Sequence, residues 1–260
     1  MNRPDPALIK ANYSRSQRLA MAVFAVPFVV LAIILVLLLP WWLGLIIALV
    51  APAAYVLWRL NGAEARIVQS VRGFELSTLG PDHVGAARLE NLVEGLIASA
   101  GVREPALYAV EDPAVNALVV GRSGDRAALV ITTGALDAFD RVELEAVVAQ
   151  LLVQIRTADV VPRTVAAALL APVASMAASQ YDRVVGRIVD PDRRFRNDAL
   201  GAAITRYPPG LVAAYERVMA SSTKPAVSPH VVEHLWMVGT GEGLGTHPPT
   251  ETRIAALREL

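Results

Sequence analysis

The chain opens with one long apolar stretch and then changes to shorter segments with helix-like and strand-like patterns. Residues 19–58 contain no charged side chain. One membrane-crossing helix needs about 20 apolar residues, so a run of this length predicts two. Pro40 interrupts the run because proline cannot continue helical hydrogen bonding, and Trp41 and Trp42 favour the headgroup level of a bilayer. The expected helices are 19–39 and 41–58.

The alternatives to two spans are one long tilted span and a buried hairpin in a soluble protein. A cleaved signal peptide fits poorly, because its apolar core would be only about 7–15 residues long. Basic residues flank both ends of the run and are absent from the turn; basic flanks stay cytoplasmic. We therefore expect a multi-pass plasma-membrane protein, embedded in the lipid bilayer, with its main domain in the cytoplasm. The flanking residues are Arg3, Lys10, Arg15, Arg18, Arg59, Arg66 and Arg72.

Beyond the hairpin, the pattern predicts a single domain with many helices and a small sheet. Helical spacing of apolar residues predicts a helix over 82–100, which Gly101 would cap. Three short runs rich in Val, Leu and Ile predict an antiparallel meander at 106–110, 115–121 and 127–132. The expected organisation is an N-terminal cytoplasmic segment at 1–18, a transmembrane hairpin at 19–58, a linker at 59–81 and a domain at 82–260.

The helix expected at 141–157 has the clearest start signal in the chain. Asp140 is a good N-cap, and Glu143 three residues later completes the pattern of a capping box. Apolar residues then recur at helical spacing and form one broad stripe. Gln150 and Gln154 lie one turn apart on the border of that stripe.

Residues 164–179 are apolar but consist mainly of alanine and serine, which makes them marginal as a membrane span. A third crossing would also put the rest of the chain on the opposite side from the 141–157 helix. We expect a helix that packs in the domain or lies on the membrane surface; a true span and a short re-entrant pair are the alternatives. Further helices are expected at 190–206, 209–220, 229–238 and after Pro249.

Composition excludes some functions. The 24 basic and 24 acidic residues cancel, so no overall field favours nucleic acid, and no nucleic-acid partner is expected. The chain has no cysteine, which excludes disulfides and cysteine-ligated metal sites.

Several short motifs, taken in order, resemble the HtpX-like family of membrane zinc metalloproteases. Asn116-Ala117-Leu118 is similar to the family's Asn-Ala-Phe strand, and residues 132–136 are similar to its Thr-x-Gly-Leu-Leu turn. The resemblance covers residues 85–260 and the membrane hairpin. It implies an α+β, mainly α, gluzincin-like peptidase domain. The remaining matching stretches are 143–149, 155–159, 234–236 and 246–249 with Glu251 and Arg253.

The residues that would carry the chemistry of this family are replaced. The resemblance implies zinc held by His-Glu-x-x-His on the 141–157 helix and by a glutamate on a later helix. Here the two histidine positions are Gln150 and Gln154, the general-base position is Leu151, and the later ligand position is Arg194. Amides are poor zinc ligands, leucine accepts no proton and arginine stays cationic. We therefore expect no zinc cofactor and no catalytic or metal-binding residue at these positions.

One segment offers a different metal site. Residues 230–234 read His-x-x-Glu-His, the inverted zinc motif, but too little chain follows for the distant glutamate that this motif needs. The simpler interpretation is two histidines, His230 and His234, on an amphipathic helix. His83 is expected in the first turn of a helix, and His247 is expected to form structural hydrogen bonds.

The expected function is a membrane-anchored pseudopeptidase that binds polypeptides or protein partners. Asn116, Ala117 and Leu118 match the family's substrate-binding edge, and an extended peptide adds to such an edge through main-chain hydrogen bonds alone. The alternatives are an active metalloendopeptidase with a non-standard metal site and a structural membrane scaffold whose groove is filled. A chance match would make Gln150, Gln154 and Arg194 ordinary surface or capping residues.

Overall fold

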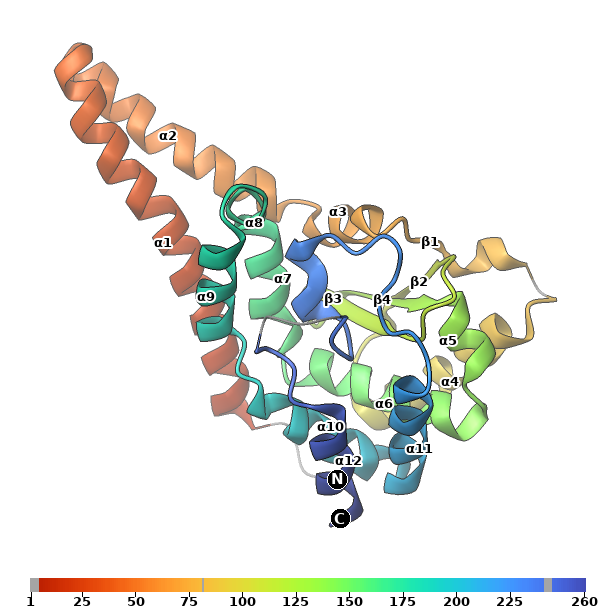
Figure 1. The fold of residues 1–260 in the computed structure, drawn as a ribbon. Coiled ribbons are helices and arrows are strands. Elements are labelled where there is room, and N and C mark those ends of the chain that lie inside the picture. The colour runs from red at the N-terminus through yellow and green to blue at the C-terminus, as the bar shows by residue number, and fades with distance from the viewer. Residues whose placement is uncertain (1–4, 81, 241–244) are drawn as a thin grey trace.

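The computed structural model describes residues 5–80, 82–240 and 245–260. A long helical hairpin stands on a mainly helical domain (Figure 1). The hairpin consists of α1 (Pro6–Leu38) and α2 (Trp41–Leu60), with Pro40 between them. Both helices are long and apolar enough to cross a membrane. The hairpin prediction agrees with this, except that α1 starts far earlier than residue 19.

The early part of α1 belongs to the domain. Asn12, Ser16 and Leu19 are buried against it, at spacings of four and three residues that place them on one helix face. The segment expected at 1–18 is therefore, from residue 6 onward, a helix packed on the domain. The apolar pattern alone missed this because the buried positions before Leu19 are polar.

Small residues let the two hairpin helices approach closely. Gly44, Ala48 and Pro52 are the buried residues of α2, and small residues at this spacing are typical of membrane helix interfaces. A Cβ atom at Gly44 would lie only 2.8 Å from the backbone carbon of Leu35. Glycine is therefore required at that contact.

The chain from residue 61 to 80, expected as a linker, contains regular elements. The first elements after the hairpin are α3 (Ala63–Ser70), β1 (Phe74–Glu75), the 3-10 helix η1 (Leu76–Leu79) and α4 (Val84–Ala100). As predicted, α4 ends at Gly101, which has a positive φ of 67°. The next elements are β2 (Ala106–Val110), β3 (Ala117–Ser123), β4 (Arg126–Thr132), α5 (Thr133–Ala138) and α6 (Arg141–Arg156).

The sheet is mixed, so the prediction of an antiparallel meander was wrong. Its strand order is β1-β2-β4-β3. β3 and β4 form an antiparallel hairpin, but β4 is inserted beside β2 and runs parallel to it. β1 then adds antiparallel to β2. Sequence patterns fix the strands but not their lateral order, because pairing beyond a hairpin depends on long-range packing. β3 is left at the edge.

Both faces of the sheet are covered. Val119, Leu129 and Ile131 face the core that contains α4 and α6, whereas Leu118 and Val130 face a second core with α3 and the segment around Trp236. Burial on both faces explains why the strands read as continuous apolar runs.

The stretch 164–179 is broken into separate helices instead of forming one. These are α7 (Val160–Leu169), α8 (Ala171–Met176) and α9 (Ala178–Ile188). Every residue of α7 is buried, so packing inside the domain accounts for its apolar character. The corner between α7 and α8 lies beside the base of the hairpin (Figure 1). The expectation of a packed helix holds for α7, and α8 and α9 are additional helices.

The remaining elements complete the domain. They are α10 (Asp192–Thr205), α11 (Pro208–Met219), the 3-10 helix η2 (His230–Leu235) and α12 (Thr250–Arg258). The α-helix expected at 229–238 was wrong, because the chain leaves the helix at Trp236, which forms an antiparallel bridge with Leu118 on β3.

Candidate active site

The glutamine pair lies on α6, at the centre of the domain. Asp140 and Glu143 form the predicted capping box, which fixes where the helix begins. Gln150 and Gln154 are 0% and 2% exposed. Although they were expected on the border of the apolar stripe, they are buried, because α10 packs over that side of α6: a Cβ on Gly201 would lie 2.8 Å from the Cα of Gln150.

The two amides form a directional chain of hydrogen bonds. Gln150 donates from Nε2 to Oδ1 of Asp198 at 3.2 Å, and Gln154 donates from Nε2 to Oε1 of Gln150 at 3.2 Å. Arg163 then donates from Nη1 to Oε1 of Gln154 at 3.0 Å. An amide has both a donor and an acceptor, so glutamine can link a carboxylate at one end to a guanidinium at the other.

Arg163 belongs to a buried charge cluster at the end of α6. Its Nη2 lies 2.9 Å from Oδ2 of Asp159, and Nη1 of Arg193 lies 3.2 Å from Oδ1 of the same carboxylate. Asn197 donates to Oδ2 of Asp159 at 3.0 Å. Burial by itself favours the protonated acid, but Arg163 and Arg193 outweigh it and hold the pKa of Asp159 below its usual range.

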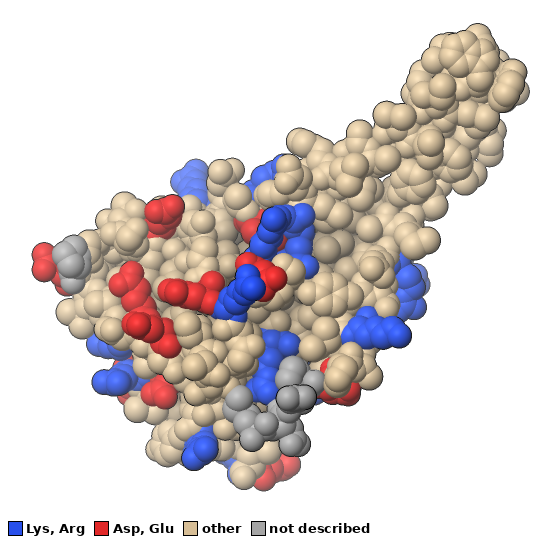
Figure 2. All heavy atoms as spheres, turned by 180° about the vertical axis from the view of Figure 1, so that it is seen from behind, with Lys and Arg blue, Asp and Glu red and all other residues tan. Residues whose placement is uncertain are grey.

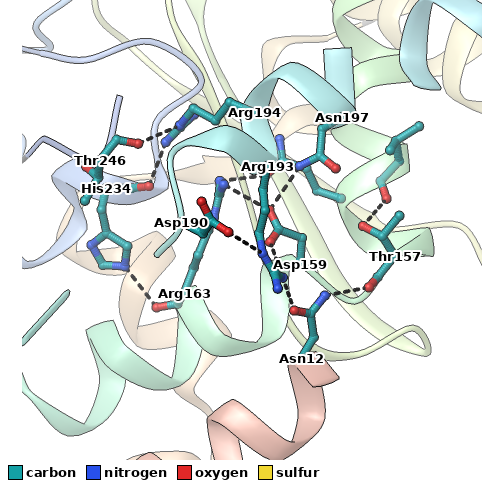
Figure 3. A network of polar contacts seen from close by, with 12 residues as sticks. Asn12, Thr157, Asp159, Arg163, Asp190, Arg193, Arg194, Asn197, His234 and Thr246 are labelled. Atoms are coloured by element: carbon teal, nitrogen blue, oxygen red, sulfur yellow. Dashed lines mark hydrogen bonds and ion pairs between the residues drawn. The ribbon is translucent and has the colours of Figure 1, made fainter. Parts of the chain in front are cut away.

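This cluster also joins the first membrane helix to the site (Figure 3). Asn12 on α1 donates from Nδ2 to the carbonyl of Thr157, just after α6, at 2.8 Å. Its Oδ1 accepts a hydrogen bond from Nη1 of Arg193 on α10. The hairpin is therefore tied to the end of α6 and to α10 by buried polar contacts.

Asp198 is held by a second cluster. Arg253 on α12 binds it through two hydrogen bonds, Nε to Oδ2 and Nη2 to Oδ1, both 2.7 Å long. Tyr215 donates to Oδ1 of Asp198 at 2.8 Å. Burial alone would lower the pKa of Arg253, but the charge of Asp198 outweighs burial and raises this pKa. One carboxylate thus connects α6, α10, α11 and α12.

Arg194 is 1% exposed, and neither glutamine is among its hydrogen-bond partners. Its guanidinium donates to four backbone carbonyls: those of His234 (3.0 Å), Trp236 (3.0 Å), Met237 (2.9 Å) and Thr246 (3.1 Å). Figure 3 shows the side chain reaching toward His234 and Thr246. Burial, and then the charges of Arg163 and Arg253, lower its pKa. Arg194 therefore holds residues 234–237 and Thr246 in place, and Asp198, one turn further along α10, contacts Gln150.

The segment fastened by Arg194 covers the edge of β3. The amide of Met237 donates to the carbonyl of Ala117 at 2.7 Å, and Trp236 forms an antiparallel bridge with Leu118. Asn116 donates from Nδ2 to the carbonyl of Val238 at 3.0 Å. Asn116, Ala117 and Leu118 are all 0% exposed. Their main-chain edge is already paired by the chain itself.

The four histidines make different polar contacts, although His230 and His234 both lie against the ring of Tyr181. His83 is the N-cap of α4 and accepts from the amide of Ala86 at 3.2 Å. Nε2 of His230 lies 2.6 Å from Oδ1 of Asp182, at the half-buried surface. His234 is buried, and burial lowers its pKa to about 3. His247 faces Arg194 at 2.6 Å, and burial followed by that charge lowers its pKa.

No group of three His, Cys, Asp or Glu side chains that could hold a metal ion occurs in the described part of the chain. His230 and His234 lie on a 3-10 helix, where three residues make a turn, so they do not share a face as they would on an α-helix. The positions of the expected zinc site carry two amides, a leucine and a guanidinium. This donor chemistry does not fit zinc.

Sequence reasoning missed Arg163, which contacts the glutamine pair directly. Its signal is a single charge inside the apolar stretch that became α7. A charged residue in a fully buried helix needs a partner, and Asp159 one turn earlier provides it. Asn12 was also missed, because nothing in the sequence links it to residues 145 or more positions away.

Comparison with known proteins places these observations in a family context. The profile of peptidase family M48 matches residues 84–184. The chain is 31% identical over 208 residues to "Protease HtpX homolog" of Dictyoglomus thermophilum, covering 66% of this chain and 69% of that one. It is 24% identical over 264 residues to the protein of the same name from Lactobacillus helveticus, covering 84% and 87%. No solved structure matches significantly.

Proposed function

Since this chain belongs to the HtpX-like proteases of peptidase family M48, we propose that it is a membrane-anchored pseudopeptidase. It keeps the family scaffold and does not hydrolyse peptide bonds. The observation that supports this is the buried chain of contacts from Asp198 through Gln150 and Gln154 to Arg163. Amides and a guanidinium stand there in place of imidazoles and an open metal position.

The positive charge of Arg163 would repel a divalent cation bound at these positions. Two unit charges 4 Å apart interact by about 4 kcal/mol at an effective dielectric constant of 20, and a divalent ion doubles the repulsion. Arg163 would lie next to such an ion. Leu151 cannot take a proton from water. Neither metal binding nor water activation has a residue to support it at these positions.

The experiment is elemental analysis and a protease assay on the purified full-length protein. We expect less than stoichiometric zinc and no casein cleavage that a chelator abolishes. Stoichiometric zinc together with chelator-sensitive cleavage would refute the proposal that the protein is a pseudopeptidase. If both also disappeared in His230→Gln, the active enzyme would use a non-standard site around that histidine.

The surviving role that we propose is a membrane scaffold with a latent polypeptide-binding edge. Asn116, Ala117 and Leu118 are the residues proposed to bind an extended peptide. The support is that residues 236–238 already contact this edge through a main-chain hydrogen bond from Met237 to Ala117 and a hydrogen bond from the Asn116 side chain to the carbonyl of Val238. A polypeptide would bind by replacing that segment. Cross-linking with a photoreactive peptide tests this role: labelling unaffected by Asn116→Ala and Leu118→Ala would remove the site.

We also propose that α1 and α2 both cross the plasma membrane, with the domain in the cytoplasm. The support is the basic residues on both flanks and their absence from the turn. Because the chain has no cysteine, single cysteines at Trp42 and Asn61 can be labelled cleanly in intact cells. A membrane-impermeant maleimide should label the first and not the second. The reverse pattern would invert the topology.

A further inference from the structure

An apolar crevice of about 550 Å³ lies where the hairpin meets the domain. Its walls come from α1, α2, the α7–α8 corner and α9, and the residues that matter below are Leu19, Ala22, Val26, Tyr55, Val173 and Val184. The hydroxyl of Tyr55, the polar group among these six side chains, donates to the carbonyl of Leu169 at 2.9 Å. The crevice therefore offers an incoming molecule almost entirely hydrocarbon contact.

The position of the crevice along the hairpin indicates whether water or lipid surrounds it. Leu19, Ala22 and Val26 lie on one face of α1, at the start of the apolar run. Tyr55 lies near the end of the apolar run on α2. The α8 turn beside them exposes Met176, which is 87% accessible. With the hairpin in a bilayer, this level corresponds to the inner leaflet, where lipid chains surround the protein.

The cytoplasmic end of the crevice carries positive charge. Arg15 lies one turn below Leu19 on the same face of α1, and Arg187 lies one turn beyond Val184 on α9. Burial and then the charge of Arg193 lower the pKa of Arg15, while the carboxylates of Asp190, just after α9, and of Asp159 act in the opposite direction. Arg187 is exposed and forms no ion pair with any described residue. Figure 2 shows Lys and Arg side chains, together with Asp and Glu, on the domain below the hairpin, which itself carries no charge on that face.

We propose that this crevice binds one anionic glycerophospholipid of the inner leaflet. An acyl chain lies against Ala22, Val26 and Val173, and the headgroup phosphate is held by Arg15 and Arg187. Charge complementarity selects an anionic headgroup, because a basic residue near the membrane surface favours anionic lipid by about 1 kcal/mol, a factor of about five. The inference rests on the proposed membrane crossing of the hairpin and is independent of the proposed loss of catalysis.

The test is native mass spectrometry of the full-length protein in mild detergent, incubated with equal amounts of phosphatidylglycerol and phosphatidylcholine. We expect one retained phosphatidylglycerol, with at least a fivefold preference over phosphatidylcholine. Arg15→Gln with Arg187→Gln should lower its retention by tenfold or more. The charge-matched control, Arg126→Gln with Lys224→Gln, changes exposed residues away from the crevice and should retain the lipid.

A second pair of variants tests the crevice itself. Ala22→Trp fills the crevice and should abolish retention, whereas Ala25→Trp places the same side chain on an exposed position of the same helix outside the lining. Equal retention of both lipids, or full retention by Ala22→Trp, would overturn the proposal. Disulfide cross-linking of Ala22→Cys at high yield would assign the crevice to a second copy and also overturn it. The membrane crossing has its own test: release of the protein from membranes by alkaline carbonate would refute it.

Discussion

The guanidinium of Arg163 on α7 lies 3.0 Å from the side-chain oxygen of Gln154 on α6, and both residues are at most 2% exposed. A fixed positive charge thus occupies the neighbourhood in which the family resemblance implies a metal cation. Its counter-charge is Asp159, 2.9 Å from Nη2.

Removing only one partner of this pair should be costly. Arg163→Met leaves the Asp159 carboxylate with less compensation, so we expect the free energy of unfolding to fall by about 3–5 kcal/mol. Asp159→Asn combined with Arg163→Met should cost clearly less than the two single changes added together. A double-mutant cycle from chemical denaturation in detergent measures this coupling. Strict additivity would mean that the two charges do not stabilise each other.

Arg194 should control the segment that covers β3. Arg194→Met removes the donors to four buried carbonyls, and each unsatisfied carbonyl costs about 1–3 kcal/mol when no water replaces the donor. We expect faster hydrogen exchange at residues 236–238 and a loss of stability of about 3–5 kcal/mol after partial rehydration. Arg196→Met, an exposed change on the same helix, is the control. Unchanged exchange at Met237 in Arg194→Met would show that the segment is held by other contacts.

Replacing glycine by alanine should have opposite effects on stability at two positions, Gly44 and Gly95. At Gly44 a Cβ would meet the Leu35 backbone at 2.8 Å, whereas at Gly95, inside α4, it would meet nothing within 4 Å. Gly44→Ala should therefore separate the hairpin helices and destabilise the protein. Gly95→Ala should stabilise it by about 0.5–1 kcal/mol through higher helix propensity. Thermal unfolding followed by tryptophan fluorescence compares the two; a stabilising Gly44→Ala would contradict the close hairpin packing.

Stability should fall as the pH drops below neutrality. Burial lowers the pKa of His234 to about 3, from 6.5 in the unfolded chain. Between these values the unfolded state binds the extra proton, so the stabilising contribution is complete above pH 6.5 and is lost as the pH falls toward 3. The expected slope is about 1.4 kcal/mol per pH unit for this histidine.

His234→Gln provides the control for this pH dependence. Its amide can replace the contacts with Tyr181 and with the carbonyl of Arg163 but does not titrate. The slope of unfolding free energy between pH 6 and pH 4 should become shallower in this variant. An identical slope would show that other groups, such as His247, cause the whole effect.

The amino-acid sequence by itself determined the features that depend on local physics. Forty uncharged residues broken by Pro40 gave the hairpin, and Asp140 with Glu143 gave the start of α6, because chain length, proline chemistry and capping act within one segment. The residue types at Gln150, Gln154 and Arg194 could also be read directly, whereas their correspondence to the family's zinc-binding positions stays a prediction. Donor chemistry belongs to a side chain whatever its surroundings.

Tertiary structure alone decided how those side chains are used. It inserted β4 between β2 and β3, brought Arg163 to Gln154, and turned Arg194 toward residues 234–237 and Thr246. It also placed residues 236–238 on the β3 edge and joined Asn12 to α6 and α10. These arrangements depend on contacts between segments separated by up to 181 positions. Buried polar groups must find partners wherever the fold brings them, and no local pattern specifies which partner is nearest.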